Sequence, residues 1–267
     1  MIDPKRPAAV SDTALSVVPG SGKSFHETQA NGQDCPFCPE LVVVPAGSFV
    51  MGSTAAEAIS PREVPAHEVT IDGFWMQQTE TTNAQYARCV AAAACTAPNN
   101  ERWDDPAYAE HGVSDVNWAQ ANAYARWAGG RLPTEAGWER SCRSDDGRAY
   151  PWGNEFDRKN CNSQSAAALE LREVGQYPGG NSPYGCADMA GNAMEWTSSW
   201  YEAYPGNLDV TKEYGQIYKV LRGGSYKSEP FDLRCARRHF DRMDVAREEY
   251  GFRCVMDIDV WNKRGRR

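Results

Sequence analysis

A cluster of arginine, glutamate and histidine side chains between Leu221 and Cys254 is the part of the sequence best suited to chemistry. Guanidinium groups bind carboxylates and phosphates through paired hydrogen bonds, and glutamate and histidine can transfer protons. The cluster therefore predicts either a ligand-binding site or a structural arginine network that joins loops together. Its arginines include Arg222, Arg234, Arg237, Arg238 and Arg253.

A strand and a sharp turn are expected to position the start of this cluster. Tyr218, Val220 and Leu221 form an apolar run, and Gly223 and Gly224 follow it. Glycine is favoured where the backbone turns sharply or approaches another group closely. We therefore expect a strand that ends at a site.

The composition favours one domain. The chain has 267 residues, of which 41% are hydrophobic, enough to form a sizeable core. Acidic residues outnumber basic ones, 36 to 28, so the chain lacks the basic surface that a nucleic acid needs. No apolar run approaches the roughly 18 residues of a membrane-spanning helix. We expect a monomer with no nucleic-acid partner and no membrane span.

Nine cysteines point to an oxidising compartment. Cys35 with Cys38 and Cys89 with Cys95 have the spacing of short-loop disulfides, which persist outside the reducing cytosol. The alternative for Cys35 and Cys38 is half of a zinc site, but the four histidines show no matching spacing. The first ten residues lack the apolar core of a signal peptide. We therefore expect a periplasmic or secreted protein whose signal peptide is absent from this sequence.

Composition changes along the chain divide it into three parts. Residues 1–34 are rich in Ser, Gly, Pro and Ala and predict a flexible lead-in. Residues 35–260 predict a single domain, and residues 261–267 a basic tail. Within the domain, residues 144–216 show no clear periodicity and are expected to be loop-rich.

Strands precede helices in the first half of the domain. Residues 40–53 predict two strands joined as a hairpin at a Pro-Ala-Gly turn, and residues 67–82 alternate as one further strand should. Three helices follow, each with a capping residue at its start or glycine at its end. They are expected over residues 83–90 after a threonine, over residues 118–128 before Gly129, and from Thr134 onward.

Six short motifs together resemble the formylglycine-generating enzyme (sulfatase-modifying factor) family. They are VVVPAGSFVMGS, RLPTEAGWERSCR, YPWGN, ADMAGNAMEWTSSWY, RGGSY and GFRC, in the family's order over about residues 40–257. The resemblance implies a loop-rich α+β fold of the C-type-lectin-like kind, with small twisted sheets and two or three helices. It also implies structural calcium.

The resemblance does not extend to the family's copper site. Founding members bind copper through two cysteines between GGSY and RCA, but this chain has KSEPFDL there, with Ser228 in the place of the first thiolate. A serine hydroxyl does not replace a thiolate as a ligand of copper(I). We therefore expect no thiolate copper site and no conversion of cysteine to formylglycine. The sequence identifies no redox cofactor.

Calcium ligands are implied by the resemblance of AGNAMEW to the family's calcium loop. The side-chain oxygens of Asn192 and Glu195 and the carbonyl of Ala193 are hard ligands that suit calcium. The alternative is that Asn192 and Glu195 hold a turn while Trp196 fills the core. Asn162 matches a second calcium position of the family, but no acidic partner follows it.

The resemblance also pairs Cys142 with Cys235. Cys254 lacks its family partner, because Ala125 stands in that place. Cys254 is therefore expected to pair elsewhere, with Cys161 or Cys186, or to stay reduced.

Two functional hypotheses follow. Members of the family without the copper thiolates act in oxidative tailoring, one of them in oxidation of the pyoverdine siderophore chromophore. The resemblance therefore implies an enzyme that acts on a small-molecule or peptide-derived substrate, in which a glutamate removes a proton and a cation stabilises negative charge. The same glutamates could instead be salt-bridge partners. The catalytic candidates are Glu229, Glu248, Glu249 and His239, and the substrate-binding candidates are Ser225, Tyr226, Ser228, Arg237, Arg238 and Trp196.

The second hypothesis is a non-catalytic, C-type-lectin-like ligand-binding module. Aromatic and polar loops such as SSWYEAYPGN suit ligand display. Fold alone does not separate the two hypotheses. A deep cavity lined by charged groups around Ser228 would favour catalysis, and a flat loop surface would favour binding.

Overall fold

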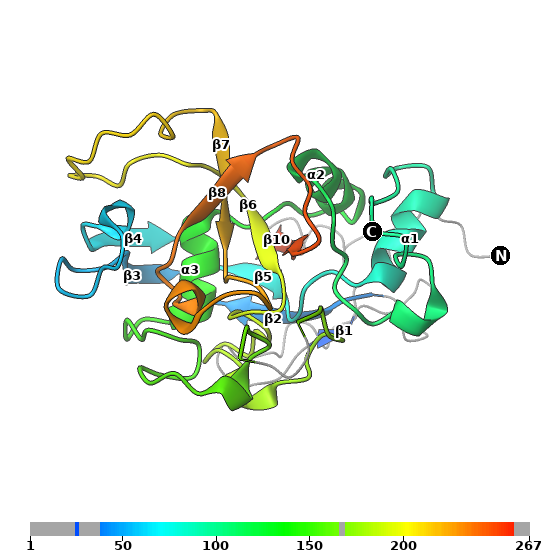
Figure 1. Ribbon diagram of the computed structural model, residues 1–267, viewed down its shortest axis with the longest axis horizontal. Helices are drawn as coiled ribbons and strands as arrows, with labels where there is room; N and C mark the ends of the chain where they lie inside the picture. The colour runs from blue at the N-terminus through cyan, green and yellow to red at the C-terminus, as the bar shows by residue number, and fades with distance from the viewer. Residues whose placement is uncertain (1–24, 27–37, 166–168, 259–267) are drawn as a thin grey trace.

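The protein is described by a computed structural model over residues 25–26, 38–165 and 169–258. Within these residues, three α-helices and three small sheets form a mixed α+β fold with long connecting loops (Figure 1). The helices are α1 (Asn83–Ala91), α2 (Trp118–Trp127) and α3 (Glu135–Arg143). The predicted fold class and the three predicted helices are confirmed.

Each helix begins at a polar capping residue. The side chains of Thr82 and Asn117 accept hydrogen bonds from backbone N–H groups three residues on. The side-chain oxygens of Gln85 and Gln120 accept from the backbone N–H groups of Thr82 and Asn117, so α1 and α2 start in capping boxes. Thr134 caps α3. These bonds satisfy N–H groups that a helix end would otherwise leave unbonded. They help to explain how helices of only 9 or 10 residues form.

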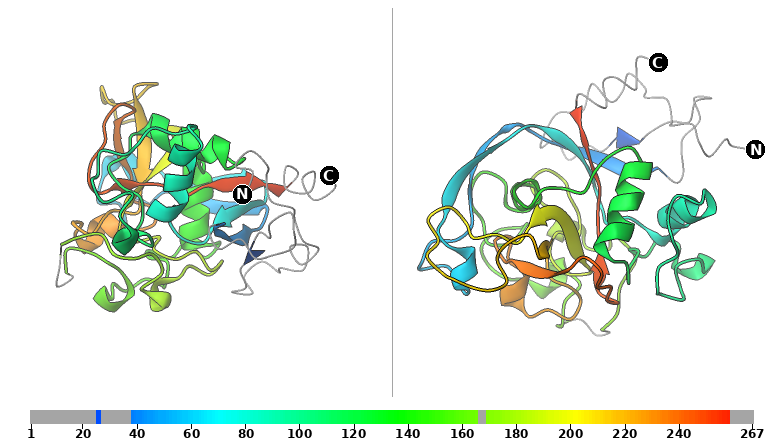
Figure 2. Two further views of the ribbon diagram at one scale, coloured as in Figure 1. Left: turned by 90° about the vertical axis from the view of Figure 1, so that its right-hand side faces the viewer. Right: turned by 90° about the horizontal axis from the view of Figure 1, so that it is seen from above.

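The first sheet is antiparallel and has the strand order β1-β2-β5-β10. Its strands are β1 (Phe25–His26), β2 (Glu40–Val44), β5 (Phe74–Gln77) and β10 (Val255–Asp257). The first and last described strands therefore belong to one sheet (Figure 2). Only residues 25 and 26 of the predicted lead-in are described, and the predicted tail lies outside the described residues.

The second sheet shows that the hairpin predicted over residues 40–53 is wrong. β3 (Gly47–Met51) pairs with β4 (His67–Ile71) and not with β2. Both edges of β2 are already taken by β1 and β5, which leaves no edge for β3. The single strand predicted over residues 67–82 is also wrong, because the chain breaks between β4 and β5. At the break, a Cβ on Gly73 would lie 3.0 Å from the Ala46 nitrogen.

The third sheet positions the candidate site. Its strands are β6 (Met194–Trp200), β7 (Tyr218–Arg222), β8 (His239–Arg242) and β9 (Tyr250–Gly251), in the order β8-β7-β6-β9. β7 is the predicted strand before the glycines. Gly224 has φ +68°, and a Cβ there would lie 2.8 Å from Leu233 and 3.0 Å from the Asp232 carbonyl. β6 was not predicted, because Ser198 breaks the alternation of apolar and polar residues that begins at Met194.

α3 lies against strands of two sheets, β3 and β4 on one side and β6 and β7 on the other. Trp138 of this helix is fully buried in a core cluster with Val44, Phe74 and Met76. The helix therefore connects the β3–β4 sheet to the sheet that carries the arginines (Figure 1).

Two of the predicted disulfides are present, Cys89–Cys95 and Cys142–Cys235. The third predicted pair includes Cys35, which lies outside the described residues. The free cysteines among the described residues are Cys161, Cys186 and Cys254, all buried. Of the alternatives for Cys254, the structure shows the reduced one.

Candidate functional site

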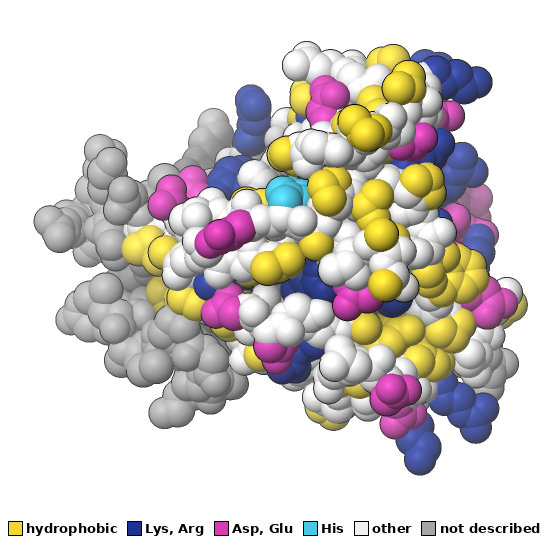
Figure 3. Space-filling view, turned by 90° about the vertical axis from the view of Figure 1, so that its left-hand side faces the viewer, with side chains coloured by type: hydrophobic (Ala, Val, Ile, Leu, Met, Phe, Trp, Pro, Cys, Tyr) yellow, Lys and Arg dark blue, Asp and Glu magenta, His cyan; other side chains and the backbone are white. Residues whose placement is uncertain are grey.

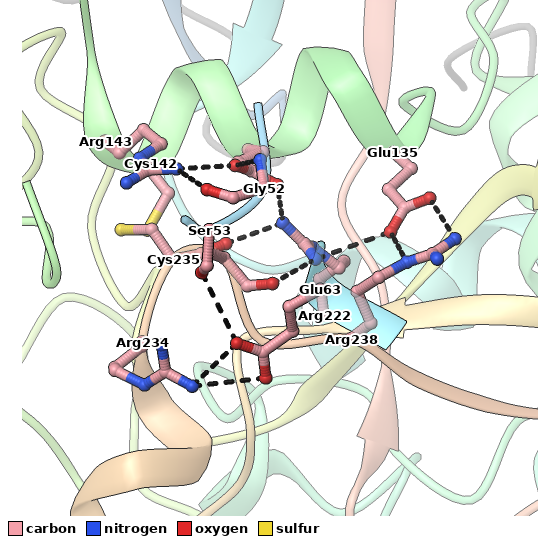
Figure 4. Close-up of polar contacts among 12 residues, drawn as sticks. Gly52, Ser53, Glu63, Glu135, Cys142, Arg143, Arg222, Arg234, Cys235 and Arg238 are labelled. Atoms are coloured by element: carbon pink, nitrogen blue, oxygen red, sulfur yellow. Dashed lines mark hydrogen bonds and ion pairs between the residues drawn. A yellow bond between two sulfur atoms is a disulfide. The ribbon is translucent and has the colours of Figure 1, made fainter. Parts of the chain in front are cut away.

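α3 presents two carboxylates to the arginine-bearing segments beneath it. Glu135 and Glu139 lie one helical turn apart, and both are nearly or completely buried. They meet Arg222 of β7 and Arg238, the residue before β8 (Figure 4). Because burial removes the hydration of a charged group, each carboxylate requires such partners.

Glu135 is held by two arginines and a tyrosine. Arg238 donates to it through Nε at 2.7 Å and through a terminal nitrogen at 2.9 Å. Arg222 approaches at 3.4 Å, and the Tyr204 hydroxyl donates at 3.2 Å. Burial alone would raise the pKa of Glu135, but Arg238 and Arg222 outweigh it and hold the pKa below its ordinary value. Glu135 is therefore an ionised structural partner and not a free base.

Glu139 of α3 joins its helix to β7 and to the segment directly after β3. It accepts hydrogen bonds from Arg222, from Arg143 at 2.9 Å and from the backbone N–H of Gly52 at 2.8 Å. Arg222 also donates to the carbonyl of the disulfide residue Cys235 at 2.6 Å. This one arginine thus connects β7 to α3 and to the loop before β8.

Glu63 neutralises two further arginines from the opposite side. It lies in η2 (Pro61–Glu63) and is fully buried. Arg234 donates to its two oxygens at 2.8 and 3.1 Å, and Arg237 donates at 3.3 Å. Arg237 also binds Asp232 at 2.7 Å. A structural arginine network, one of the two alternatives predicted from the sequence, is therefore present.

A cavity of about 200 Å³ borders this network at the edge strand β8. The Arg62 guanidinium lies 5.5 Å from the ring centroid of Phe240, and Tyr201 stacks on Phe240 with centroids 4.2 Å apart. The cavity thus combines cationic groups with aromatic faces. Its lining includes Arg62, Tyr201, Arg237, Arg238, His239 and Phe240.

His239 brings a neutral imidazole to this cavity. Burial, followed by the charge of Arg237, lowers the pKa of His239 to about 4. Nε2 lies 3.8 Å from Asp232, beyond hydrogen-bond range, and is buried without a hydrogen-bond partner among the described residues. At neutral pH this ring nitrogen is therefore not engaged by the protein.

Ser228, which the resemblance places at the family's first thiolate, belongs to a buried turn. The Ser228 hydroxyl accepts a hydrogen bond from the N–H of Ser225 at 3.0 Å, and Ser225 in turn accepts from the N–H of Lys227 at 3.2 Å. Tyr226 is also buried. None of these three predicted substrate-binding residues, Ser225, Tyr226 and Ser228, lines the cavity at β8. In this structure they shape the turn after β7.

The three predicted catalytic glutamates also lie outside the lining of the cavity. Glu248 and Glu249 both bind Lys227, Glu249 at 3.1 Å. Glu229 is exposed at the start of η6 (Pro230–Leu233). For Glu248 and Glu249 the structure thus shows the salt-bridge alternative, with a lysine as the partner.

Trp196, a predicted substrate-binding residue, fills the core. Its side chain is fully buried, and its Nε1 donates to the Val116 carbonyl at 3.0 Å. It stacks edge-on against Tyr250. Trp196 therefore presents no surface to a ligand, as the alternative interpretation of AGNAMEW expects.

Asn192 and Glu195, two of the predicted calcium ligands, are engaged in hydrogen bonds. Asn192 Oδ1 accepts from Asn162 at 2.9 Å and from the N–H of Arg172 at 3.0 Å. Both Glu195 oxygens accept from Arg253 at 2.7 Å. A carboxylate that already neutralises a buried guanidinium fits poorly as a ligand of a second cation.

Asn162 fits a metal better than the other predicted ligands do. Its Oδ1 is buried and has no hydrogen-bond partner among the described residues. Buried amide oxygens normally have a partner, and a hard cation is one that would suit. Ala193 contributes its N–H to Glu80 at 3.1 Å. Calcium therefore stays a prediction, and Asn162 is the candidate ligand whose buried side-chain oxygen lacks a partner among the described residues.

Sequence reasoning missed the carboxylates that neutralise the arginines. Glu135 and Glu139 are four residues apart on one helix, and this spacing could have indicated a charged inner face. Arg62 and Glu63 lie in the short helix η2, in a stretch of sequence without periodicity, so no local signal marks them.

Comparison with known proteins identifies the family. Residues 26–258 match the sulfatase-modifying factor enzyme 1-like domain. The chain belongs to the sulfatase-modifying factor family. This confirms the resemblance that the six motifs carry.

Relatives of this sulfatase-modifying factor family member include proteins with different names. The chain is 32% identical to the serine/threonine-protein kinase pkn1 of Chlamydia caviae, over 84% of this chain and 39% of that protein. It is 30% identical to the formylglycine-generating enzyme of Mus musculus, over 82% and 75%. It is 32% identical to the hercynine oxygenase of Mycobacterium tuberculosis, over 79% and 59%. The chain thus spans about two-fifths of the chlamydial relative.

A solved structure supports the fold of this family member. PvdO from Pseudomonas aeruginosa superposes with a TM-score of 0.72, covering 90% of this chain and 99% of that chain. The sequence identity is 24%, so the likeness concerns the fold.

Surface charge, helix length and the disulfides are the features of the described residues that concern possible partners and location. Basic and acidic side chains are interspersed on the face that carries the β3–β4 sheet (Figure 3). Among the described residues, the helices are too short or too polar to cross a bilayer. The two disulfides are compatible with an oxidising, extracytoplasmic location.

Proposed function

We propose that the protein is an exported tailoring enzyme that oxidises an aromatic, siderophore-like chromophore of the pyoverdine type without thiolate copper. One relative is named as an oxygenase, hercynine oxygenase, and another is named as the formylglycine-generating enzyme. The observation that carries the proposal is the cavity at β8. It places the neutral His239 beside Arg62, Arg237 and the Phe240 ring.

Substrate binding uses the aromatic faces and the arginines together. A planar substrate lies against Phe240 and Tyr201, and its anionic oxygen meets Arg62 and Arg237. A guanidinium has five N–H donors. One terminal nitrogen of Arg62 donates to Glu213 at 3.0 Å, and the other N–H groups of this guanidinium can donate to a substrate oxygen. The arginines thus act in the network and in the cavity at once.

The reaction removes two electrons and two protons from the substrate. His239 accepts one proton from a phenolic or N–H group, and the nearby guanidinium groups stabilise the anion that forms. An imidazole of low pKa is a weak base. Proton removal therefore depends largely on stabilisation of the substrate anion by the arginines. Dioxygen takes the two electrons and both protons and becomes hydrogen peroxide. The substrate gains one double bond.

The test compares cavity variants with a variant outside the cavity. We expect His239→Gln to lower chromophore oxidation by about 10²- to 10⁴-fold while the protein remains folded at pH 7.5. Glu248→Gln, at an exposed lysine pair, should keep wild-type activity. Product formation and oxygen consumption by purified protein, and rescue of a deletion strain, provide the readouts. Full activity of His239→Gln would disprove the role given to His239.

The proposal also excludes copper chemistry of the founding type. Ser228 has no thiolate and its hydroxyl already accepts a hydrogen bond. The purified protein should neither bind copper(I) tightly nor convert a sulfatase-type cysteine peptide to formylglycine. Ser228→Cys should not restore either property, because the second thiolate is also missing. Formylglycine in the peptide, detected by mass spectrometry, would contradict this.

A binding module is the second candidate function. The connection between β6 and β7 projects away from α1 and α2 (Figure 1), and on it Leu208 and Val210 are 93% and 95% exposed. Large exposed apolar side chains on a loop suit contact with a partner. Under this alternative, Leu208→Ser with Val210→Ser abolishes partner binding, and the purified wild-type protein oxidises no chromophore.

A further inference from the structure

A second cavity, of about 520 Å³, shares no lining residue with the one at β8. It lies where His111 and Glu173 form an isolated β-bridge. Its volume falls within the range of small-molecule sites, and its lining is polar. The lining residues are His111, Arg172, Glu173, Gln176 and Tyr177.

The loop that supplies most of this lining is fixed by buried groups. The N–H of Arg172 donates to the buried Asn192 at 3.0 Å, and the N–H of Gly175 donates to the buried Asp188 at 2.6 Å. The β-bridge to His111 holds the loop between these two bonds. A site held in this way loses little conformational freedom when a ligand binds.

Arg172 offers a nearly unused cation to the cavity. Its side chain is 41% exposed, and its only ion pair among the described residues reaches Glu170 at 3.9 Å. That distance is too long for a hydrogen bond. The guanidinium therefore retains the paired donors that match a carboxylate.

His111 and Gln176 add hydrogen-bonding groups of both kinds. Nδ1 of His111 is buried without a partner among the described residues, which favours the tautomer with the proton on Nε2. Burial lowers the pKa of His111 below its ordinary value, which favours the neutral ring. Gln176 donates its amide to Glu173 at 3.0 Å and keeps its carbonyl as an acceptor. Such donors and acceptors suit hydroxyl groups.

We propose that this cavity binds a small hydroxylated monocarboxylate of the sugar-acid class. The carboxylate pairs with Arg172, and hydroxyl groups bond His111 and Gln176. The Tyr177 ring covers the carbon face of the ligand. Glu173 disfavours a second negative charge, so the ligand carries one.

The test is calorimetric titration of the full chain with D-glucuronate. We expect saturable binding with one site, and at least about tenfold weaker binding of D-glucose, which lacks the carboxylate, and of benzoate, which lacks the hydroxyls. Arg172→Gln should weaken glucuronate binding at least about tenfold. The control Arg126→Gln, at an exposed position outside the lining, should leave it unchanged.

Three results would overturn the proposal: no saturable glucuronate binding, equal binding of glucose, or unchanged affinity in Arg172→Gln. Melting curves of both variants establish that they are folded. His239→Gln should bind glucuronate normally, so this test is independent of the function proposed for the other cavity.

Discussion

Glu135 and Arg238 form a two-pronged ion pair that joins the first turn of α3 to the residue before β8. The two donor–acceptor distances are 2.7 and 2.9 Å, and both side chains are almost fully buried. The pair is the point at which the helix meets the segment that lines the cavity. Its integrity therefore affects both stability and the position of Arg238.

Removing the charge of Glu135 should be costly. In Glu135→Gln, Arg238 stays buried and charged with less compensation, so the free energy of unfolding should fall by about 3–5 kcal/mol. The control is Asp244→Asn, whose partner Arg242 is 63% exposed, and it should leave stability nearly unchanged because solvent screens an exposed ion pair. Urea denaturation measures both. Equal losses would mean that Glu135 is not the main counter-charge of Arg238.

The two disulfides should contribute unequally. Cys142 and Cys235 are 93 residues apart, whereas Cys89 and Cys95 are 6 apart. If the cross-link acts through the entropy of the unfolded chain, loss of the long one costs about 4–5 kcal/mol and loss of the short one about 2 kcal/mol. Non-reducing mass spectrometry should first show both bonds. Double alanine variants then give the two losses in urea, and the reverse order would argue against the entropic origin.

His239 should make stability depend on pH below neutrality. Its pKa is lowered to about 4 by burial and by Arg237, so between about pH 6.5 and 4 the unfolded chain binds the proton and the folded protein does not. The free energy of unfolding of the wild type should therefore fall through this window, by about 2–3 kcal/mol more than that of His239→Gln. Above pH 7 the difference between the two proteins should be constant. Parallel curves throughout would show that His239 is not buried as a neutral group.

Calcium binding can be tested at Asn162. If calcium binds the unpartnered Oδ1, added calcium raises the melting temperature by mass action, and chelator reverses the increase. Asn162→Ala should abolish the calcium-dependent increment. Asn181→Ala is the matched control, because Asn181 also has a buried, unpartnered Oδ1 but lies outside the predicted site. An unchanged melting temperature of the wild type on addition of calcium would contradict the prediction. Glu195→Ala is less informative, because it also leaves the buried Arg253 without its carboxylate partner.

The candidate site was predictable only in part. Arg237, Arg238 and His239 are adjacent in the sequence, and the structure places all three around one cavity. Ser228 and Glu248 belong to the same stretch of sequence but do not line this cavity. Ser228 accepts a hydrogen bond from Ser225, and Glu248 binds Lys227. Neighbouring residues of an irregular segment point in different directions, so closeness in sequence does not decide which side chains share a cavity.

The sequence by itself determined the three helices and the family. Capping residues and apolar spacing specify helices because these interactions lie within a few residues of each other, and Thr82 and Thr134 act as predicted. Six motifs identify the family because each is a short continuous stretch of sequence and all six occur in the family's order.

Only the tertiary structure decided which charges are neutralised and which strands pair. Glu63 meets Arg234 across 171 positions of sequence, and Glu135 meets Arg238 across 103. β3 pairs with β4 rather than β2 because β1 and β5 occupy both edges of β2. Ion pairs and strand pairs of this kind depend on which distant segments are buried against each other, and burial is set by the packing of the whole chain.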